Sequence, residues 1–173
     1  MKFLETKFKG AYVIEIEKNL DERGFFARTF DKKQFLELGL DVDLFQSNIS
    51  FNKKTGILRG MHYQDSPYEE TKIVRCTQGK IFDVIIDLRS NSPTFRKWIS
   101  FELSSQNFKM IYIPKGFAHG FQTLEDNTEI FYNMSDCYMP KYANGIAWND
   151  KSINIKWPLE NPILSDNDKS YQS

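Results

Sequence analysis

The sequence predicts an all-β protein, an antiparallel sandwich or barrel with a few short helices. The chain of 173 residues is rich in aromatic side chains, with 15 Phe, 8 Tyr and 3 Trp, and aromatic residues favour strands over helices. After the first quarter of the chain, short runs of β-branched and aromatic residues alternate with turn residues. Many short strands separated by turns are typical of sandwiches and barrels.

One segment near the N-terminus has the pattern of a short helix. Asp31 is followed three residues later by Gln34, as in a capping box, and the apolar residues Phe35 and Leu36 come next. Gly39 supplies a stop signal. This pattern predicts a helix of about two turns.

Most of the remaining chain predicts strands, bounded by Gly, Pro, Asn, Asp and Ser residues. The predicted strands cover residues 44–50, 57–64, 72–77, 80–89, 97–103, 108–113, 120–124 and 128–135. The segment Thr77-Gln-Gly-Lys80 lies between two of them and predicts a tight hairpin. No linker or repeat divides the chain, so we expect a single domain over residues 1–173. The polar tail from Asp166 onward predicts a mobile end.

Strand alternation suggests which side chains point inward. Tyr132 shares a strand face with Ile130, so it is expected to point with apolar neighbours. Lys72 shares a face with Val74 and Cys76. If that face is the inner one, Lys72 lies inside the barrel, but the opposite face fits the pattern equally well.

Charge and composition exclude several classes of protein. The 23 basic and 23 acidic residues balance, with a pI near 6.7, so the basic footprint of a nucleic-acid-binding protein is missing. No apolar run is long enough to span a membrane, and the charged start does not resemble a signal peptide. Cys76 and Cys137 lack CxxC spacing and predict buried free thiols in strands. We therefore expect a cytoplasmic protein.

Cofactor motifs are also missing from the sequence. Cupin-type metal sites usually contain a His-x-His pair with further Glu and His ligands, and the chain has neither. It also has no glycine-rich dinucleotide or phosphate-binding fingerprint. We expect no metal and no cofactor, which leaves cofactor-free proton transfer as the most economical chemistry.

The two histidines of the chain are the strongest candidates for that chemistry, because histidine exchanges protons near neutral pH. His62 and His119 each lie in a glycine-flanked aromatic stretch, at residues 56–64 and 113–121. Taken singly, each candidate residue has an ordinary explanation as a core or surface side chain. A lumen that gathers a base, a phenol, a lysine and two arginines is costly unless it binds a polar ligand.

Ordered motifs along nearly the whole chain resemble the dTDP-4-dehydrorhamnose 3,5-epimerase family. They are found at residues 21–26, 45–48, 58–64, 72–75, 83–89, 92–94, 113–121, 148–150 and 164–168. The resemblance implies a cupin-like double-stranded β-helix, or jelly roll, that usually forms a homodimer. It also implies that the substrate is a nucleotide-diphospho-4-keto-6-deoxyhexose, inverted at C3, C5 or both in deoxysugar biosynthesis.

The resemblance also assigns catalytic roles. A C–H bond next to the C4 ketone is acidic because its electrons delocalise onto oxygen, but inversion requires proton removal on one face and return on the other. The family pattern makes His62 the base and Asp168 its orienting carboxylate. Tyr132 matches the acid on the opposite face. Lys72 matches the lysine that stabilises the enolate oxygen.

The remaining matched positions are expected to contact the substrate, and they are Arg23, Phe26, Arg28, Gln46, Asn48, Arg59 and His119. Arginine suits the pyrophosphate because its guanidinium group forms paired hydrogen bonds. Arg59 and His62 have opposite strand parity, so a bulge at Gly60 is needed for both to face the ligand.

Three positions depart from the family pattern, namely Arg28, Ala143 and Asn167, where acidic or basic residues are usual. Arg28 offers only donors, which suit cytosine or guanine, whereas a carboxylate suits thymine or uracil. Arg28 can equally pair with a nearby acid in an enzyme that still uses dTDP-sugars. The sequence leaves the inverted carbon open, and it leaves two alternatives: a non-catalytic cupin-like nucleotide-sugar-binding module, or a ketoisomerase on the same scaffold.

Overall fold

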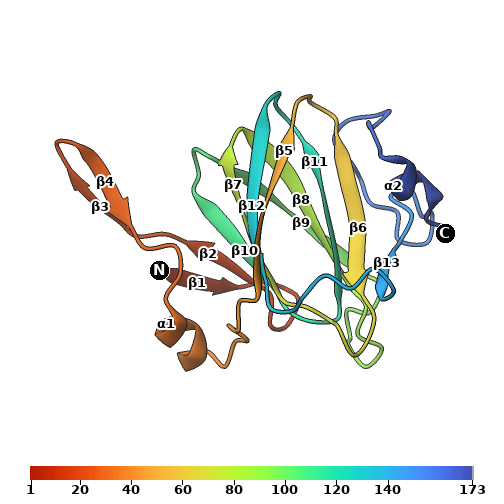
Figure 1. Cartoon of the computed structure of the whole chain (residues 1–173), viewed down its shortest axis with the longest axis horizontal. Helices are drawn as coiled ribbons and strands as arrows, with labels where there is room; N and C mark the ends of the chain where they lie inside the picture. The colour runs from red at the N-terminus through yellow and green to blue at the C-terminus, as the bar shows by residue number, and fades with distance from the viewer. Residues whose placement is uncertain (173) are drawn as a thin grey trace.

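The computed structural model describes residues 1–172 and contains two facing antiparallel β-sheets with a separate two-stranded ribbon (Figure 1). Its elements are β1 (Lys2–Glu5), β2 (Tyr12–Glu15), β3 (Lys18–Asp21), β4 (Gly24–Ala27), α1 (Lys32–Glu37), β5 (Gln46–Asn52), β6 (Leu58–Gln64), β7 (Lys72–Gln78), β8 (Lys80–Asp87), β9 (Trp98–Ser104), β10 (Lys109–Ile113), β11 (Phe117–Thr123), β12 (Thr128–Met134), β13 (Ala143–Gly145) and α2 (Asp166–Ser170). The predicted all-β fold is confirmed.

Strands from β5 to β12 cross repeatedly between the two sheets. One sheet has the order β1-β2-β10-β7-β12-β5, and the other has the order β13-β6-β11-β8-β9. Within the described chain, every strand pair is antiparallel. This alternation between two sheets is the jelly roll that the resemblance implied. All eight strands predicted after the helix are present, and no end differs from the prediction by more than three residues.

The hairpin predicted at residues 77–80 is wrong. Strands β7 and β8 follow each other directly, but β7 pairs with β10 and β12, whereas β8 pairs with β9 and β11. Gly79 between them has a φ of +74°, and a Cβ at this position would collide with Thr128. The glycine therefore makes a tight corner by which the chain leaves one sheet and enters the other.

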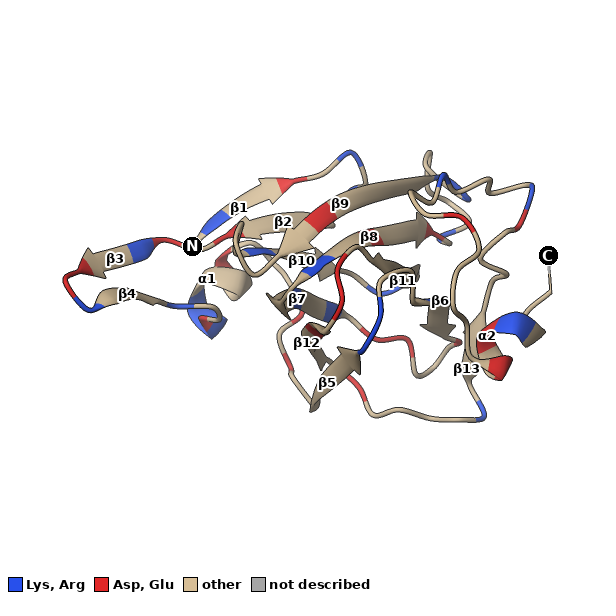
Figure 2. Cartoon of the chain, turned by 90° about the horizontal axis from the view of Figure 1, so that it is seen from above, with Lys and Arg blue, Asp and Glu red and all other residues tan. Residues whose placement is uncertain are grey.

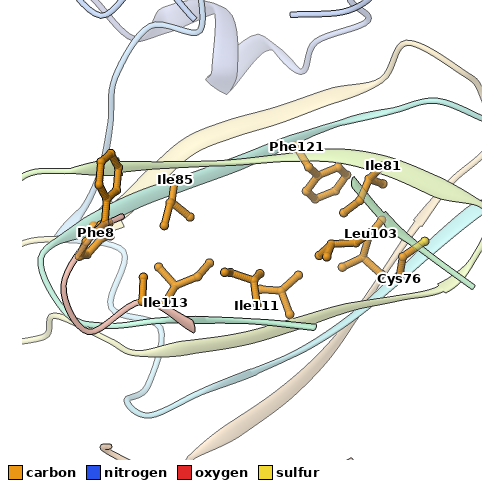
Figure 3. Close-up of a cluster of buried hydrophobic side chains, with 12 residues drawn as sticks. Phe8, Cys76, Ile81, Ile85, Leu103, Ile111, Ile113 and Phe121 are labelled. Atoms are coloured by element: carbon orange, nitrogen blue, oxygen red, sulfur yellow. The ribbon is translucent and has the colours of Figure 1, made fainter. Parts of the chain in front are cut away.

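An apolar core fills the space between the sheets. Figure 3 shows side chains of both sheets pointing into this layer, among them Ile85 and Ile111, with Phe8 at one end. Val74 and Cys76 of β7 and Ile130 of β12 belong to the same cluster. The inner face of β7 is thus the face that carries Lys72, which resolves the ambiguity in strand parity. Cys76 is a buried free thiol, as predicted.

A bulge in β6 confirms the expectation at Gly60. On the neighbouring strand β11, His119 is opposite His62 and Phe121 is opposite Arg59, so β6 has one residue more than its partner over this interval. Gly60 has a φ of +125°, and a Cβ there would lie 2.5 Å from the Cα of Gly120. The two strands can approach this closely only because both positions are glycine.

The predicted helix is confirmed as α1. Asp31 is its N-cap and accepts a hydrogen bond from the backbone N–H of Lys33. Gln34, which was expected to complete a capping box, instead accepts from the Met1 ammonium at 3.4 Å. Phe35 is fully buried and contacts the ring of Phe3 edge to face, with 5.0 Å between centroids. The helix is therefore fixed to the outer face of the six-stranded sheet.

Two regions differ from the sequence expectations. Residues 166–170, at the start of the tail that was expected to be mobile, form α2, whose Asp168 is buried, and residue 173 of that tail lies outside the described residues. Cys137 was expected in a strand, but it lies half-buried in the loop after β12, again as a free thiol. Both differences arise because the C-terminal segment and this loop pack against β6.

The ribbon β3–β4, which we call the arm, projects away from the two sheets (Figure 1).

Figure 2 shows Lys and Arg interspersed with Asp and Glu along the chain. No helix within residues 1–172 is long and apolar enough to cross a membrane.

The bulge gives a stability prediction. Gly60→Ala should destabilise the protein by at least about 2 kcal/mol more than Gly56→Ala, because it adds a backbone collision to an unfavourable φ. Gly56 has a comparable positive φ of +82°, but a Cβ added there would meet no atom of residues 1–172 within 4 Å, so it isolates the conformational cost. Urea unfolding of both variants measures the difference, and equal losses would contradict the steric role of the bulge.

Candidate active site

The two sheets separate around a cavity of about 410 Å³. Its polar lining includes Arg59 and His62 from β6, Lys72 from β7, His119 from β11 and Tyr132 from β12. Five of the predicted site residues are therefore brought together from four strands. Phe121 and Ile130, which belong to the apolar core, also line the cavity, so the core forms its floor.

His62 is paired with Asp168, as the resemblance implied. The distance from its Nε2 to Oδ1 of Asp168 is 2.5 Å, and 106 residues separate the two in sequence. The N-terminal cap of α2 fixes the carboxylate, because Ser165 donates its hydroxyl to Oδ2 at 2.8 Å. In Figure 1, α2 lies beside the sheet edge that contains β6. The C-terminal segment thus folds back against the cavity to deliver Asp168.

The charge state of Asp168 follows from these contacts. Burial raises its pKa, but the hydrogen bond and charge of His62, together with bonds from Ser165 and the backbone of Gly60, bring it below the ordinary value. An ionised carboxylate can only accept hydrogen bonds, so His62 donates from Nε2. Its Nδ1 is then the basic nitrogen, on an imidazole that is 40% exposed.

His119 has a carboxylate partner of its own, which sequence reasoning missed. Its Nε2 lies 2.7 Å from Oδ2 of Asp83, a residue of β8 that is fully buried. Burial raises the pKa of Asp83, and the nearby charges of His119 and Lys72 oppose this rise. The two histidines are direct cross-strand partners. The cavity wall therefore presents two oriented imidazoles side by side, and only that of His62 is widely exposed.

Tyr132 lies on the opposite sheet from His62. Burial raises the pKa of its phenol, and the charge of Glu70 adds to the rise while that of Arg59 opposes it. The phenol is therefore held protonated at neutral pH. On the adjacent strand, Lys72 is 8% exposed and forms an ion pair of 2.8 Å with Glu70. The acid Tyr132 and the cation Lys72 thus lie across the cavity from the two histidines.

Arg59 is oriented by a buried amide. Its Nε donates to Oδ1 of Asn52 at 2.7 Å, and Asn52 in turn donates to the backbone carbonyls of Ser50 and Thr128. This network holds the arginine stem at the rim while its side chain stays exposed to solvent. A guanidinium fixed in this way is suited to bind an anionic group.

The arm residues are not in the cavity of their own chain, which corrects the expectation of two arginines in one lumen. Arg23 is 87% exposed and pairs with Asp21 at 2.6 Å. Phe26 is 69% exposed on the same ribbon. Arg28 forms an ion pair with Asp31 at 2.9 Å. This is the contact expected if Arg28 pairs with a nearby acid instead of binding the nucleotide base.

Gln46 and Asn48 lie on the sheet face that borders the cavity, but they are not among the residues that line it. They are the cross-strand partners of Met134 and Tyr132, whose side chains do line it. Gln46 accepts from the backbone N–H of Tyr138 at 3.0 Å. Its observed contact therefore fixes the loop that follows β12.

Several residues at the mouth of the cavity carried no clear signal in the sequence. Tyr138 is 58% exposed and lines the cavity. Tyr171 stands edge to face with His62, with 5.9 Å between ring centroids, and accepts a hydrogen bond from Asn167. The departures Ala143 and Asn167 both line this cavity. Among residues 1–172, no cluster of three or more His, Cys, Asp or Glu side chains could hold a metal ion.

Comparisons with known proteins agree with this geometry. The model of the family described as dTDP-4-dehydrorhamnose 3,5-epimerase matches residues 5–173. A dTDP-4-dehydrorhamnose 3,5-epimerase of Shigella flexneri is 46% identical over 173 residues, which cover 99% of this chain and 95% of the relative. The crystal structure of the Bacillus anthracis enzyme of that name, with TDP and PPi bound, superimposes with a TM-score of 0.96 at 41% identity, covering 99% of this chain and 98% of the other.

A 3′-monoepimerase of Streptomyces bikiniensis, in complex with dTDP-quinovose, is also similar, with a TM-score of 0.89 at 29% identity over 96% of this chain and 84% of the other. The fold and the site define an isomerase of the carbohydrate epimerase type. The chain belongs to the dTDP-4-dehydrorhamnose 3,5-epimerase family.

The pair of His62 and Asp168 gives a kinetic prediction. Asp168→Asn should lower the turnover of a 4-keto-sugar substrate by about 100-fold or more, because the imidazole loses the charge that fixes its tautomer. Asp166→Asn is the matched control, since this fully exposed carboxylate lies on the same short helix. Steady-state kinetics measure both, and similar rates for the two variants would contradict the assigned role of Asp168.

Proposed function

We propose that this protein inverts C3, C5 or both of a nucleotide-diphospho-4-keto-6-deoxyhexose without a cofactor, as a step of deoxysugar biosynthesis. One observation supports this most directly. A histidine oriented by a buried carboxylate lies on one sheet, and a tyrosine held protonated lies on the facing sheet, across one cavity. Inversion needs a base and an acid on opposite faces of the sugar, and this arrangement supplies both.

The proposed reaction proceeds through an enolate. Nδ1 of His62 removes the proton from the carbon next to the C4 ketone, and the C–H electron pair moves onto the ketone oxygen. The Lys72 ammonium stabilises the negative oxygen, as preorganised donors do in other enolate-forming sites. Tyr132 then gives its proton to the opposite face of the same carbon while the carbonyl re-forms. The inverted sugar and a phenolate result, and the proton on His62 returns to the tyrosine through solvent.

The alternative of a non-catalytic binding module is less well supported. Such a module would keep arginines and aromatic residues, but it would not need Asp168 within hydrogen-bond distance of His62, where it is found. A ketoisomerase on the same scaffold would move the carbonyl group without inverting a carbon. Product NMR separates this reaction from epimerisation.

We propose dTDP as the nucleotide portion of the substrate. The similar proteins are named for dTDP-sugars, and the Bacillus anthracis structure has TDP bound. Arg28, whose donors suggested a different base, forms an ion pair with Asp31, the N-cap of α1 in its own chain. The free thiols of Cys76 and Cys137 agree with action in the cytoplasm.

Solvent exchange tests the reaction. With a dTDP-4-keto-6-deoxyhexose in deuterium oxide, the wild-type protein should incorporate deuterium at C3 or C5, and NMR identifies the carbon. His62→Ala should abolish incorporation, whereas Tyr132→Phe should slow inversion by about 100-fold and leave some exchange. If the wild-type protein shows no deuterium exchange with dTDP-, UDP-, CDP- or GDP-linked 4-keto sugars, the proposal is refuted. Equal, mild losses of activity in both variants would mean that the roles of His62 and Tyr132 are misassigned.

We propose further that the protein acts as a homodimer in which each arm completes the cavity of the partner. The family pattern places substrate contacts at Arg23, Phe26 and Arg28, yet these residues lie outside the cavity of their own chain. The arm exposes Leu20 and Phe26 at 78% and 69%. A projecting ribbon with exposed apolar side chains is suited to bind a second copy.

Mixed dimers test this arrangement. One protomer carries His62→Ala with an intact arm, and the other carries Arg23→Ala and Phe26→Ala with an intact cavity. Each homodimer should be nearly inactive, because one lacks the base and the other lacks the arm residues. The mixed dimer should regain activity, because the intact arm of the first protomer completes the intact cavity of the second. Size-exclusion chromatography and separate affinity tags isolate the mixed species. Failure of the mixed dimer to regain activity would contradict arm exchange.

A further inference from the structure

Among residues 1–172, Glu70 is the only acidic residue that lines the cavity, and neither the sequence motifs nor the proposed reaction uses it. It lies in the loop between β6 and β7, two residues before Lys72. The cavity otherwise presents Arg59, Lys72 and two histidines, a set that suits an anionic ligand. A carboxylate close to a pyrophosphate would repel it. Glu70 therefore marks the end of the cavity that receives the neutral sugar.

The carboxylate is held in a buried position with one partner. Its Oε1 lies 2.8 Å from Nζ of Lys72, and the exposed fractions of the two side chains are 3% and 11%. Within residues 1–172, the second oxygen Oε2 is buried and has no hydrogen-bond partner. Leaving a buried carboxylate oxygen unpaired is costly. The negative charge is consequently not shared with other donors and acts mainly on Lys72.

The surrounding backbone keeps Glu70 in this position. Thr71, the next residue, donates its backbone N–H to Oγ of Ser135 and accepts from the backbone N–H of Ser135. Gln64 donates to the carbonyl of Tyr68 in the same loop and to that of Cys137 in the loop after β12. The ion pair is therefore built on a loop that is anchored at both ends.

We propose that Glu70 is a positioning residue for epimerisation, which holds the Lys72 ammonium, in its charged form, beside the C4 ketone of the sugar. This inference rests on the proposed function. Burying the ammonium of Lys72 is costly unless it is paired, and the carboxylate of Glu70 at 2.8 Å supplies that partner. The carboxylate also restricts the flexible lysine stem to one orientation, which an enolate-stabilising donor requires.

The negative charge has a second measurable consequence at Tyr132. Glu70 contributes to the raised pKa of the Tyr132 phenol, in addition to the larger effect of burial and against the opposing charge of Arg59. Removing the charge of Glu70 should lower the pKa of Tyr132, so the alkaline limb of the rate profile should move to lower pH. The other titratable or charged groups that line the cavity are Arg59, His62, Tyr63, Lys72, His119, Tyr138 and Tyr171.

Glu70→Gln is the test, because it keeps the shape and an acceptor for Lys72 but removes the charge. It should lower kcat by about 10-fold to 100-fold with KM near the wild-type value, and it should move the alkaline limb to lower pH. Glu70→Asp keeps the charge, so its alkaline limb should stay near that of the wild type. Glu69→Gln is the matched control, since its half-buried side chain is one residue away and does not line this cavity.

A double-mutant cycle with Lys72→Met separates positioning from packing. If Glu70 acts through Lys72, then Glu70→Gln should cause little further loss of kcat at pH 7 in the Lys72→Met background. Additive losses, or a Glu70→Gln variant with the kinetics and pH profile of Glu69→Gln, would overturn the proposal. Should Glu70→Gln fail to fold, Glu70→Ala takes its place, and a wild-type kcat and alkaline limb in that variant would overturn the proposal equally. A wild-type protein without deuterium exchange would instead refute the proposed function itself.

Discussion

The close approach of β6 and β11 is the constraint on which the site depends. A Cβ at Gly60 would lie 2.5 Å from the Cα of Gly120, so the two strands meet at a distance that only glycine permits. The resulting bulge changes the parity of β6, and Arg59 and His62 both reach the cavity. The backbone of Gly60 also contributes to the low pKa of Asp168. The bulge at Gly60 therefore orients His62 toward the cavity, and it also helps to keep the carboxylate of Asp168 ionised.

Each charged or basic group that lines the cavity has a polar partner, and this is how the jelly roll tolerates them in its interior. The partner of His62 is Asp168, that of His119 is Asp83, that of Lys72 is Glu70 and that of Arg59 is Asn52. Unpaired charges would be costly at the two most buried of these positions, Lys72 and His119. The same pairings fix the orientation of every group before a ligand binds, which lowers the cost of reaching the enolate.

The partners come from distant parts of the chain, and so the site depends on the fold as a whole. Asp168 lies in α2, a five-residue helix whose N-cap is Ser165. Asp83 lies in strand β8, and Glu70 lies in the loop before β7. The arm that contains Arg23 and Phe26 points away from all of them. In the proposed dimer, the chemistry belongs to one chain while part of the substrate recognition comes from the other. The chemistry and the recognition of the substrate can then change independently, which agrees with the departure at Arg28, directly after the arm.

Sequence patterns alone predict the all-β class, the strands after residue 44, the helix at Asp31 and, through the ordered motifs, the pair of His62 and Asp168. The fold class, the strands and the helix depend on local patterns of side chains, which act over a few residues, whereas the pair of His62 and Asp168, 106 residues apart, was implied by the resemblance to a known family. The folded chain was needed to see that Gly79 makes a corner between sheets rather than a hairpin, that Lys72 points inward, and that residues 166–170 form a helix. It also shows that Asp83 and Glu70 support His119 and Lys72, and that Arg23 lies outside the cavity. The physical reason is that sheet membership and buried charge pairing depend on residues far apart in the chain, whose proximity no local pattern records.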